Sequence, residues 1–367
     1  GAHTATGKPL IANDPHLGLS VPAIWYFAHV SAPGLNVIGA TLPGIPAILI
    51  GRNDRIAWGF TNTYGDVQDL FIERVVEGDP TNYESPEGPR PFRLREEIIH
   101  IKDSDPLRLT VRLTRHGPVV SDLMSEAHQK QMGNHVLALA WTALDDVDNT
   151  ARAPLDMGRA GNWQEFTAAL RQYGGPQQNM LYADIDGHIG FYAPARIPVR
   201  DPANLIRGTL PSPGWDARFD WTGYLPFEQL PHRFDPPNGK IATANNAIVD
   251  DSYPHHITYD WEHPYRIRRI DALLSARDKH SVDSFVRAQG DNVSTMAGDF
   301  LAHLIAAKPQ SEAIRRAVEM FKSWDGDMDL NRPEPLLFSQ WYRELEKLVY
   351  ADELGSLFTE ARRLRPM

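Results

Sequence analysis

The sequence of 367 residues contains no cysteine. This absence excludes disulfide bonds, thiol nucleophiles and zinc sites that use cysteine ligands. It does not identify a cellular compartment, because proteins of oxidising compartments can also lack cysteine. Any catalytic or metal-binding chemistry must therefore come from other side chains.

Long apolar runs and basic clusters are missing as well. No apolar run approaches the roughly 18 residues that a membrane-spanning helix needs, so we expect no segment of this chain to cross a membrane. The net charge is −10, and no stripe of lysine and arginine is present. A nucleic-acid partner is therefore not expected, because phosphate binding needs a basic surface.

The chain does have enough apolar residues for a large core. Hydrophobic residues make up 42% of it, which excludes global disorder. The earlier part reads as short apolar runs bounded by glycine and proline, a pattern typical of strands. From Tyr265 onward, apolar residues recur at helical spacing. Strands first and helices later predict the α+β class, with layers packed on one another.

These patterns also predict the domain organisation. Residues 1–264 are expected to form a β-rich core, and residues 265–367 a helical portion. Residues 199–240 are rich in proline, glycine, aspartate and tryptophan, so we expect a long irregular excursion there. Strands are expected at 35–38, 47–50, 56–60, 69–75, 92–101, 107–113, 135–141, 180–185, 188–192 and 239–244. Helices are expected at 161–173, 266–277, 281–289, 295–307, 309–323 and 338–352.

A polar stretch near the start has two interpretations. Residues 7–12 read as a short apolar strand that stops abruptly at Asn13-Asp14-Pro15-His16. Asparagine, aspartate and proline are turn formers, so His16 is incidental in the first interpretation. In the second, the turn swings His16 to the end of a rigid strand, where a catalytic pocket is usually built.

Two asparagines lie where strands are expected to end. Asn62 follows the strand at 56–60, and Asn245 follows the strand at 239–244. Amide groups at such ends can donate hydrogen bonds to a developing oxyanion, and one such donor contributes about 3 kcal/mol. The alternative is an ordinary turn in which the side chain bonds its own backbone.

A short acidic loop could bind a cation. Asp66 and Asp69 flank Val67-Gln68, and two carboxylates with backbone carbonyls suit Ca²⁺, which prefers oxygen ligands. The alternative is a solvated acidic turn. Further along, the segment 266–269 carries three arginines at the start of a helix. Most of these are expected to be solvated or paired, and one could turn inward to orient a polar group.

Several short motifs follow one another in a fixed order. They are Gly7-Lys8-Pro9-Leu10, Asn13-Asp14-Pro15-His16, Leu42-Pro43-Gly44, Gly51-Arg52-Asn53, Ile56-Ala57-Trp58-Gly59-Phe60-Thr61-Asn62, Gly65-Asp66-Val67-Gln68-Asp69, Gln178-Asn179, Ala183-Asp184, Ala244-Asn245-Asn246 and Pro264-Tyr265-Arg266. The ordered set resembles the β-chain of penicillin acylase-type amidases. These are N-terminal-nucleophile hydrolases, a group that includes acyl-homoserine-lactone acylases, and the resemblance covers at least residues 7–275.

The resemblance implies a four-layer αββα fold with an added helical segment, and hydrolysis of a linear amide (N-acyl) bond. In that family a precursor cuts itself and exposes an N-terminal serine. The serine is the nucleophile and its own α-amine is the base, which is reasonable because an α-amine has a pKa near 8. An acyl-enzyme forms, and water then releases the carboxylic acid.

Catalytic roles carry over to four residues of this sequence. His16 would lie beside the nucleophile and orient its amine. The backbone N–H of Asn62 and the side chain of Asn245 would form the oxyanion hole, and Arg266 would support the site. The resemblance also implies an apolar pocket for an aliphatic or aromatic acyl chain. It would be lined by Leu17, Ile50, Phe60 and Trp141.

The resemblance further implies a structural Ca²⁺ ion and no organic cofactor. Its ligands would be the carboxylates of Asp66 and Asp69 and the carbonyls of Gln68 and Pro202, with Asp260 a candidate for a further carboxylate. The implied partners are an α-chain from the same precursor and a small-molecule N-acyl substrate, such as a β-lactam or an acyl-homoserine lactone. The implied location is periplasmic or secreted.

One departure from the family pattern concerns the nucleophile. A Ser-Asn-x-Trp segment should immediately precede Gly1, so we expect this chain to be a β-chain fragment without amidase activity of its own. Ser20 and Ser31 do not replace the nucleophile, because neither has a free amine. Two alternatives stay open: a non-catalytic ligand-binding module that keeps the fold, and a scaffold stabilised by Ca²⁺.

Overall fold

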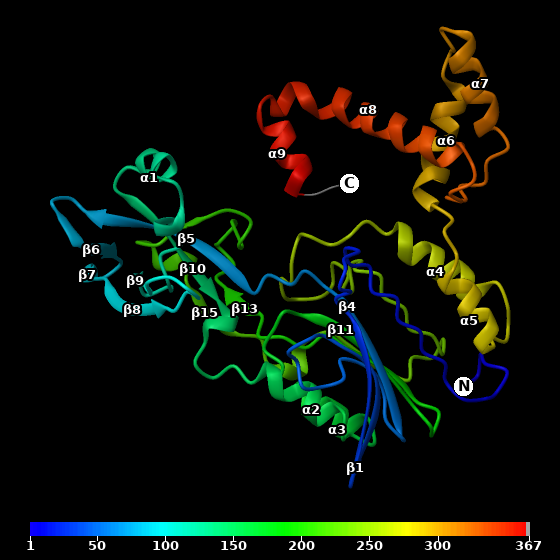
Figure 1. Ribbon diagram of the computed structural model, residues 1–367, viewed down its shortest axis with the longest axis horizontal. Helices are drawn as coiled ribbons and strands as arrows, with labels where there is room; N and C mark the ends of the chain where they lie inside the picture. The colour runs from blue at the N-terminus through cyan, green and yellow to red at the C-terminus, as the bar shows by residue number, and fades with distance from the viewer. Residues whose placement is uncertain (365–367) are drawn as a thin grey trace. The chain divides into compact units, whose positions relative to one another are not determined.

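The computed structural model describes residues 1–364. The chain divides into two compact units, Gly1–Glu262 and His263–Met367. The first unit is rich in strands, and the second is helical (Figure 1). The division follows the change from strand-like to helix-like sequence patterns near Tyr265.

A seven-stranded sheet forms the centre of the first unit. Its neighbouring strands are all antiparallel. The middle pair is β4 with β11, in which Asn62 lies opposite Gln178. In spatial order the strands are β1 (Tyr26–Ala32), β2 (Leu35–Thr41), β3 (Ile50–Arg52), β4 (Ile56–Asn62), β11 (Gln178–Asp184), β12 (Ile189–Tyr192) and β16 (His232–Phe234).

Two helices, α2 (Ala153–Met157) and α3 (Trp163–Leu170), pack on one face of this sheet. Asn162 caps α3 by accepting a hydrogen bond of 2.9 Å from the backbone N–H of Glu165. Phe166 of α3 is fully buried in the cluster that contains Trp58 and Tyr182 of the sheet. Each such side chain contributes about 1.5–3 kcal/mol on burial, so this layer anchors β4 and β11.

A second sheet has β5 (Gln68–Val76) beside β10 (His135–Trp141), with Gln68 opposite Trp141. The loop from Asn62 to Gln68 connects β4 of the large sheet to β5 of this one. The other strands of the second sheet are β6 (Asp79–Ser85), β7 (Gly88–Pro91) and β14 (Ser212–Pro213). Two two-stranded sheets complete the strands: β8 (Arg93–Ile99) with β9 (Leu107–Leu113), and β13 (Pro198–Arg200) with β15 (Trp221–Tyr224).

Short helical segments connect these strands. One α-helix, α1 (Glu126–Met132), precedes β10. The 3-10 turns are η1 (Ser121–Leu123), η2 (Thr142–Leu144), η3 (Thr150–Arg152), η4 (Ala217–Phe219) and η5 (Phe227–Gln229).

The second unit contains six helices among the residues that the structure describes. They are α4 (Tyr265–Ser275), α5 (Val282–Gln289), α6 (Thr295–Ala306), α7 (Glu312–Phe321), α8 (Glu334–Leu354) and α9 (Leu357–Leu364). Its core is a separate cluster built around Ala297, Phe321, Trp324 and Phe338. Within residues 1–364, no helix is both long and apolar enough to span a bilayer.

Most predicted elements are present, and four predictions differ from the structure. Residues 7–12 and 239–244 form no strand. Of the expected strand at 47–50, only Ile50 belongs to one, because β3 begins there. The excursion at 199–240 contains β14, β15 and β16 as well as the end of β13, so it is more ordered than expected. Short strands rich in proline and glycine give little periodic signal.

Candidate active site

Asn62 and Asn245 lie side by side. Asn62 is the last residue of β4, and Asn245 lies in a loop of the same unit. The side-chain Nδ2 of Asn245 donates a hydrogen bond of 2.7 Å to the backbone carbonyl of Asn62. Both residues are half-buried. The geometry therefore brings together the two amides that the sequence singled out, although they are 183 positions apart.

The backbone is unusual at this pair. Asn245 has a φ of +64° and Tyr64, two residues after Asn62, has a φ of +56°. Asparagine tolerates the left-handed region, but a bulky residue such as tyrosine adopts it rarely. Such conformations persist only where the surrounding structure enforces them, and they concentrate at functional sites. The two turns beside Asn62 and Asn245 are thus held in specific shapes.

A hydroxyl network supports the same strand end. Thr61 donates a hydrogen bond of 3.0 Å to the hydroxyl of Thr243, two residues before Asn245. Asn179 of β11 donates to the Thr61 hydroxyl at 3.0 Å. The bond between Thr61 and Thr243 ties the loop of Asn245 to β4 at a second point.

Asn13 contacts β4, which the sequence analysis did not foresee. Its side-chain oxygen accepts a hydrogen bond of 2.5 Å from the backbone N–H of Phe60. Gly59 permits this approach, because a Cβ there would lie 2.3 Å from that oxygen. Asn13 was expected only to form a turn; instead it attaches the segment that contains His16 to the strand that contains Asn62. A glycine three residues before the end of a strand was the available signal.

The other two predicted catalytic residues are His16 and Arg266. His16 is exposed, and its Nε2 lies 3.9 Å from a carboxylate oxygen of Asp14. Arg266 lies in the first turn of α4, in the second unit. The roles of His16 and Arg266 stay predictions.

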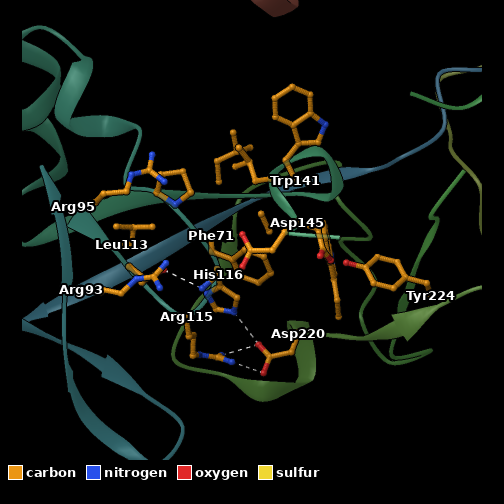
Figure 2. Close-up of a pocket in the computed structure, with 18 residues that line it drawn as sticks. Phe71, Arg93, Arg95, Leu113, Arg115, His116, Trp141, Asp145, Asp220 and Tyr224 are labelled. Atoms are coloured by element: carbon orange, nitrogen blue, oxygen red, sulfur yellow. Dashed lines mark hydrogen bonds and ion pairs between the residues drawn. The ribbon is translucent and has the colours of Figure 1, made fainter. Parts of the chain in front are cut away.

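The four predicted pocket residues lie in different surroundings. Phe60 packs against the core cluster of the large sheet, with its ring 6.5 Å from that of Trp25. Ile50 begins β3 and is half-buried, whereas Leu17 lies exposed in an irregular segment. Trp141 lines a cavity of about 470 Å³ beside the second sheet (Figure 2). The other three do not line this cavity.

That cavity borders a charged cluster that the sequence analysis missed. His116 has its Nδ1 2.7 Å from a carboxylate oxygen of Glu73 and its Nε2 3.0 Å from one of Asp220. Its ring stacks on Phe71 at 3.6 Å, and Arg115 binds Asp220 through two nitrogens (Figure 2). Partial burial opposes ionisation of Asp220, but the hydrogen bonds from His116 and Arg115 hold the pKa of its carboxyl below the ordinary value. Glu73, the pair Arg115-His116 and Asp220 come from three distant parts of the chain, so no local motif marks the cluster.

The predicted calcium ligands already have partners in the protein. Asp69 is paired with Arg200 through two nitrogens, at 2.9 and 2.7 Å. The carboxylate oxygens of Asp66 lie 2.9 Å from His256 Nε2 and 3.1 Å from the Thr258 hydroxyl. Ca²⁺ requires 6–8 oxygen ligands, and a guanidinium against Asp69 repels a second cation. This donor set therefore does not fit a calcium ion.

The remaining predicted ligands add no metal cluster. Gln68 and Pro202 have exposed side chains, as does Asp260. Across the described part of the chain, no group of three or more histidine, cysteine, aspartate or glutamate side chains could hold a metal ion. A calcium ion at this loop was expected from the resemblance, and no chemistry is assigned to one here.

Comparisons with known proteins agree with the resemblance. The family model for penicillin amidase matches residues 1–367. The acyl-homoserine lactone acylase QuiP of Pseudomonas aeruginosa is 31% identical over 369 residues, which cover 95% of this chain and 43% of QuiP. The penicillin acylase 2 proenzyme of Pseudomonas sp. SE83 is 30% identical over 353 residues, covering 95% of this chain and 44% of the proenzyme. The chain spans less than half the length of these curated relatives.

A solved structure confirms the fold. The thermostable penicillin G acylase of Alcaligenes faecalis matches with a TM-score of 0.77 and 26% sequence identity, covering 94% of this chain and 61% of that one. The predicted α+β fold of the N-terminal-nucleophile type is therefore confirmed. Of the expected αββα layers, the first unit supplies the seven-stranded sheet and the helical layer of α2 and α3. The chain belongs to the penicillin amidase family.

Proposed function

We propose that this chain is part of an enzyme that hydrolyses a linear N-acyl amide to a carboxylic acid and an amine. The observation that carries the proposal is the direct hydrogen bond between Asn245 and Asn62. It holds a side-chain amide beside the last peptide of β4, where both can donate to one oxyanion. An oxyanion donor of this kind lowers the barrier by about 3 kcal/mol.

In the proposed reaction the nucleophile is an N-terminal serine, as in the resemblance. The resemblance implies that this serine precedes Gly1 in the full-length precursor, and the proposal adopts that position. Its hydroxyl attacks the amide carbon while its proton passes to the neutral α-amine. The tetrahedral oxyanion is held by Asn62 and Asn245. Collapse breaks the C–N bond as the departing amine takes the proton, and water then hydrolyses the acyl ester.

The proposed substrate is a small N-acyl amine with an apolar acyl group. Phe60 precedes Asn62 by two residues in β4, so both side chains lie on one face of that strand. The aromatic rings of Phe60 and Trp25 supply apolar surface next to the proposed oxyanion site. The relatives' names include penicillin and acyl-homoserine lactone acylases, and both substrate classes carry such an acyl group.

The proposed partner is an α-chain cut from the same precursor. Apolar side chains near the start of the chain are open to solvent: Phe27 of β1 is 80% exposed, and Leu19, in the segment before β1, is fully exposed. An apolar surface of this kind is typical of an interface. The periplasmic or secreted location is proposed from the family relationship alone.

The proposal is tested with the full-length precursor, processed and purified. We expect release of nitroaniline from acyl p-nitroanilides, and at least a 100-fold lower kcat in the Asn245→Ala variant. Asn36→Ala is the matched control, because Asn36 lies in the same sheet and its side chain binds Asp54 and His29. Full activity of the Asn245→Ala variant would show that the Asn245 side chain does not stabilise the oxyanion.

The predicted role of His16 has its own test. His16→Ala in the processed enzyme should lower turnover sharply with little change in Tm, because the side chain is exposed. The 367-residue chain alone is expected to be inactive. Binding of an acyl ligand without turnover by the processed protein would favour the alternative of a ligand-binding module.

A further inference from the structure

Arg200 lies in an almost fully buried ion pair with Asp69. Its Nε and Nη2 donate hydrogen bonds of 2.9 and 2.7 Å to the two carboxylate oxygens of Asp69. The side chains are 4% and 2% exposed, respectively. Two parallel N–H···O bonds fix both the distance and the plane of a carboxylate. This pair is therefore a rigid connection between β13 and the first residues of β5.

The same guanidinium reaches the loop that follows Asn62. Its Nη2 also donates a hydrogen bond of 3.1 Å to the backbone carbonyl of Asp66. Trp221 donates from its indole N–H to Asp69 at 2.7 Å. One cation thus binds two carboxylate oxygens and a backbone carbonyl of the segment 66–69. This is the type of oxygen set that the sequence suggested for Ca²⁺.

The fold brings Arg200 to this position through a two-stranded sheet. Arg200 of β13 lies opposite Trp221 of β15, so both side chains approach Asp69 from one sheet. Gly208, in the chain between these strands, has a φ of +84°, and a Cβ there would lie 2.5 Å from an Asp69 carboxylate oxygen. The absence of a side chain at position 208 therefore leaves space for the Asp69 carboxylate.

The nearby carboxylate of Asp66 also has a basic partner. His256 Nε2 lies 2.9 Å from one oxygen of Asp66, and the Thr258 hydroxyl donates to the other at 3.1 Å. The backbone N–H of Asp66 donates to Ile257 at 2.9 Å. Each of the two loop carboxylates is thus satisfied by side chains of this chain.

We propose that the Arg200 guanidinium takes the place of a calcium ion and holds the loop 62–69 without any metal. The inference does not depend on the proposed amide hydrolysis, since it concerns how the loop is held. Because Asn62 begins this loop, Arg200 is a positioning residue for the candidate oxyanion site and does not itself contact a substrate.

The first experiment uses the wild-type processed protein. We expect metal analysis to find less than one tenth of a calcium per molecule, and Tm to change by less than about 1 °C with excess EGTA or with 5 mM CaCl₂. One bound calcium per molecule, or a fall in Tm with EGTA that calcium reverses, would overturn the proposal. This measurement decides the question even where variants fail to fold.

The second experiment removes the guanidinium. Arg200→Gln leaves the buried carboxylate of Asp69 without a cation, so we expect Tm to fall by roughly 10 °C. Added calcium should then raise the Tm of this variant, and Arg200→Lys should restore part of the loss without calcium. A purely packing role would predict no response to calcium, and that result would contradict the proposal.

The matched control is Arg112→Gln. Arg112 also binds a carboxylate through two nitrogens, at 2.9 and 2.6 Å from Asp122, but away from the loop 62–69. We expect its Tm to change little, with or without calcium, because the pair is partly exposed. Calcium stabilisation of this control equal to that of Arg200→Gln would indicate a non-specific salt effect and would also overturn the proposal.

Discussion

The side-chain amide of Asn245 donates a hydrogen bond to the backbone carbonyl of Asn62 over 2.7 Å. Asn245 adopts a left-handed backbone to do so, with a φ of +64°. The amide and the backbone conformation are therefore two separable properties of one residue.

The first prediction separates these two properties. Asn245→Gly keeps the left-handed backbone and loses the amide, whereas Asn245→Ala loses the amide and strains the backbone by about 1 kcal/mol. We expect both variants of the processed enzyme to lose kcat to a similar extent. Both also lose the hydrogen bond to Asn62, so Tm should fall in both, and further for Asn245→Ala. The measurements are turnover of an acyl p-nitroanilide and thermal unfolding. If Asn245→Gly kept wild-type kcat, the amide would have no catalytic role.

The second prediction concerns the close approach of Asn13 to Gly59. A Cβ at Gly59 would lie 2.3 Å from the Asn13 oxygen, so Gly59→Ala must displace the acceptor of the Phe60 N–H. We expect a loss of about 2 kcal/mol in the free energy of unfolding by urea. The control is Gly18→Ala, because a Cβ there meets no atom within 4 Å. Equal stability of Gly59→Ala and wild type would show that the segment adjusts without cost.

The third prediction is a pH dependence that comes from Asp184. Burial acts against its ionisation, but N–H groups of Asp186, Gly187 and His188 donate to one of its oxygens at 2.9, 2.8 and 2.9 Å. Together with the hydroxyl of Tyr182, these bonds hold the pKa of Asp184 below its ordinary value. The unfolded state then binds the proton more readily. The stabilisation is therefore complete above the unfolded pKa of about 3.9 and is lost as pH falls through the lower folded pKa.

The measurement is unfolding by urea between pH 7 and pH 2.5. We expect Asp184→Asn to be less stable than wild type by about 1–3 kcal/mol at pH 7, with the difference shrinking at the lowest pH. Asp186→Asn is the control, since Asp186 forms an exposed ion pair with Arg55 and should change stability by less than about 1 kcal/mol. A difference that stays constant across this pH range would argue against ionised Asp184 as its source.

The fourth prediction is strong coupling between His116 and Glu73. Glu73 is fully buried, and its oxygen lies 2.7 Å from His116 Nδ1. His116→Leu removes this partner and leaves a buried carboxylate unpaired, so we expect a loss of about 3–5 kcal/mol. His116→Leu combined with Glu73→Leu should cost clearly less than the sum of the single variants. If the losses in the free energy of unfolding from the two single variants simply added in the double variant, the coupling would be contradicted. The more exposed pair Arg74–Glu84 serves as the weakly coupled control.

The sequence predicted the parts of the fold that have a strong local period. The segments 56–60 and 180–192 contain apolar runs, or apolar residues that alternate with polar ones, between turn residues. The predicted strand and hairpin both occur in the large sheet. The pairing of Asn62 with Asn245 was anticipated only through the family resemblance, since no local pattern brings together residues 183 positions apart.

Other contacts had no local signal at all. In the sequence, Arg200 is one of many basic residues and lies in a stretch expected to be irregular. In the structure it forms an ion pair with Asp69, 131 positions earlier. Asn13 read as a turn former, because its bond to Phe60 spans 47 positions. Such long-range polar contacts depend on which strands become neighbours, and that is decided by the whole core rather than by the residues concerned.

The distance along the chain between the two asparagines has a consequence for timing. A hydrogen bond across 183 positions closes only after the strands between them have found their neighbours, because contacts of high sequence separation form late and slowly. A partly folded chain therefore lacks this amide pair. A precursor whose self-cleavage depended on this pair would stay uncut until it had folded. Cleavage would then occur only in correctly folded molecules.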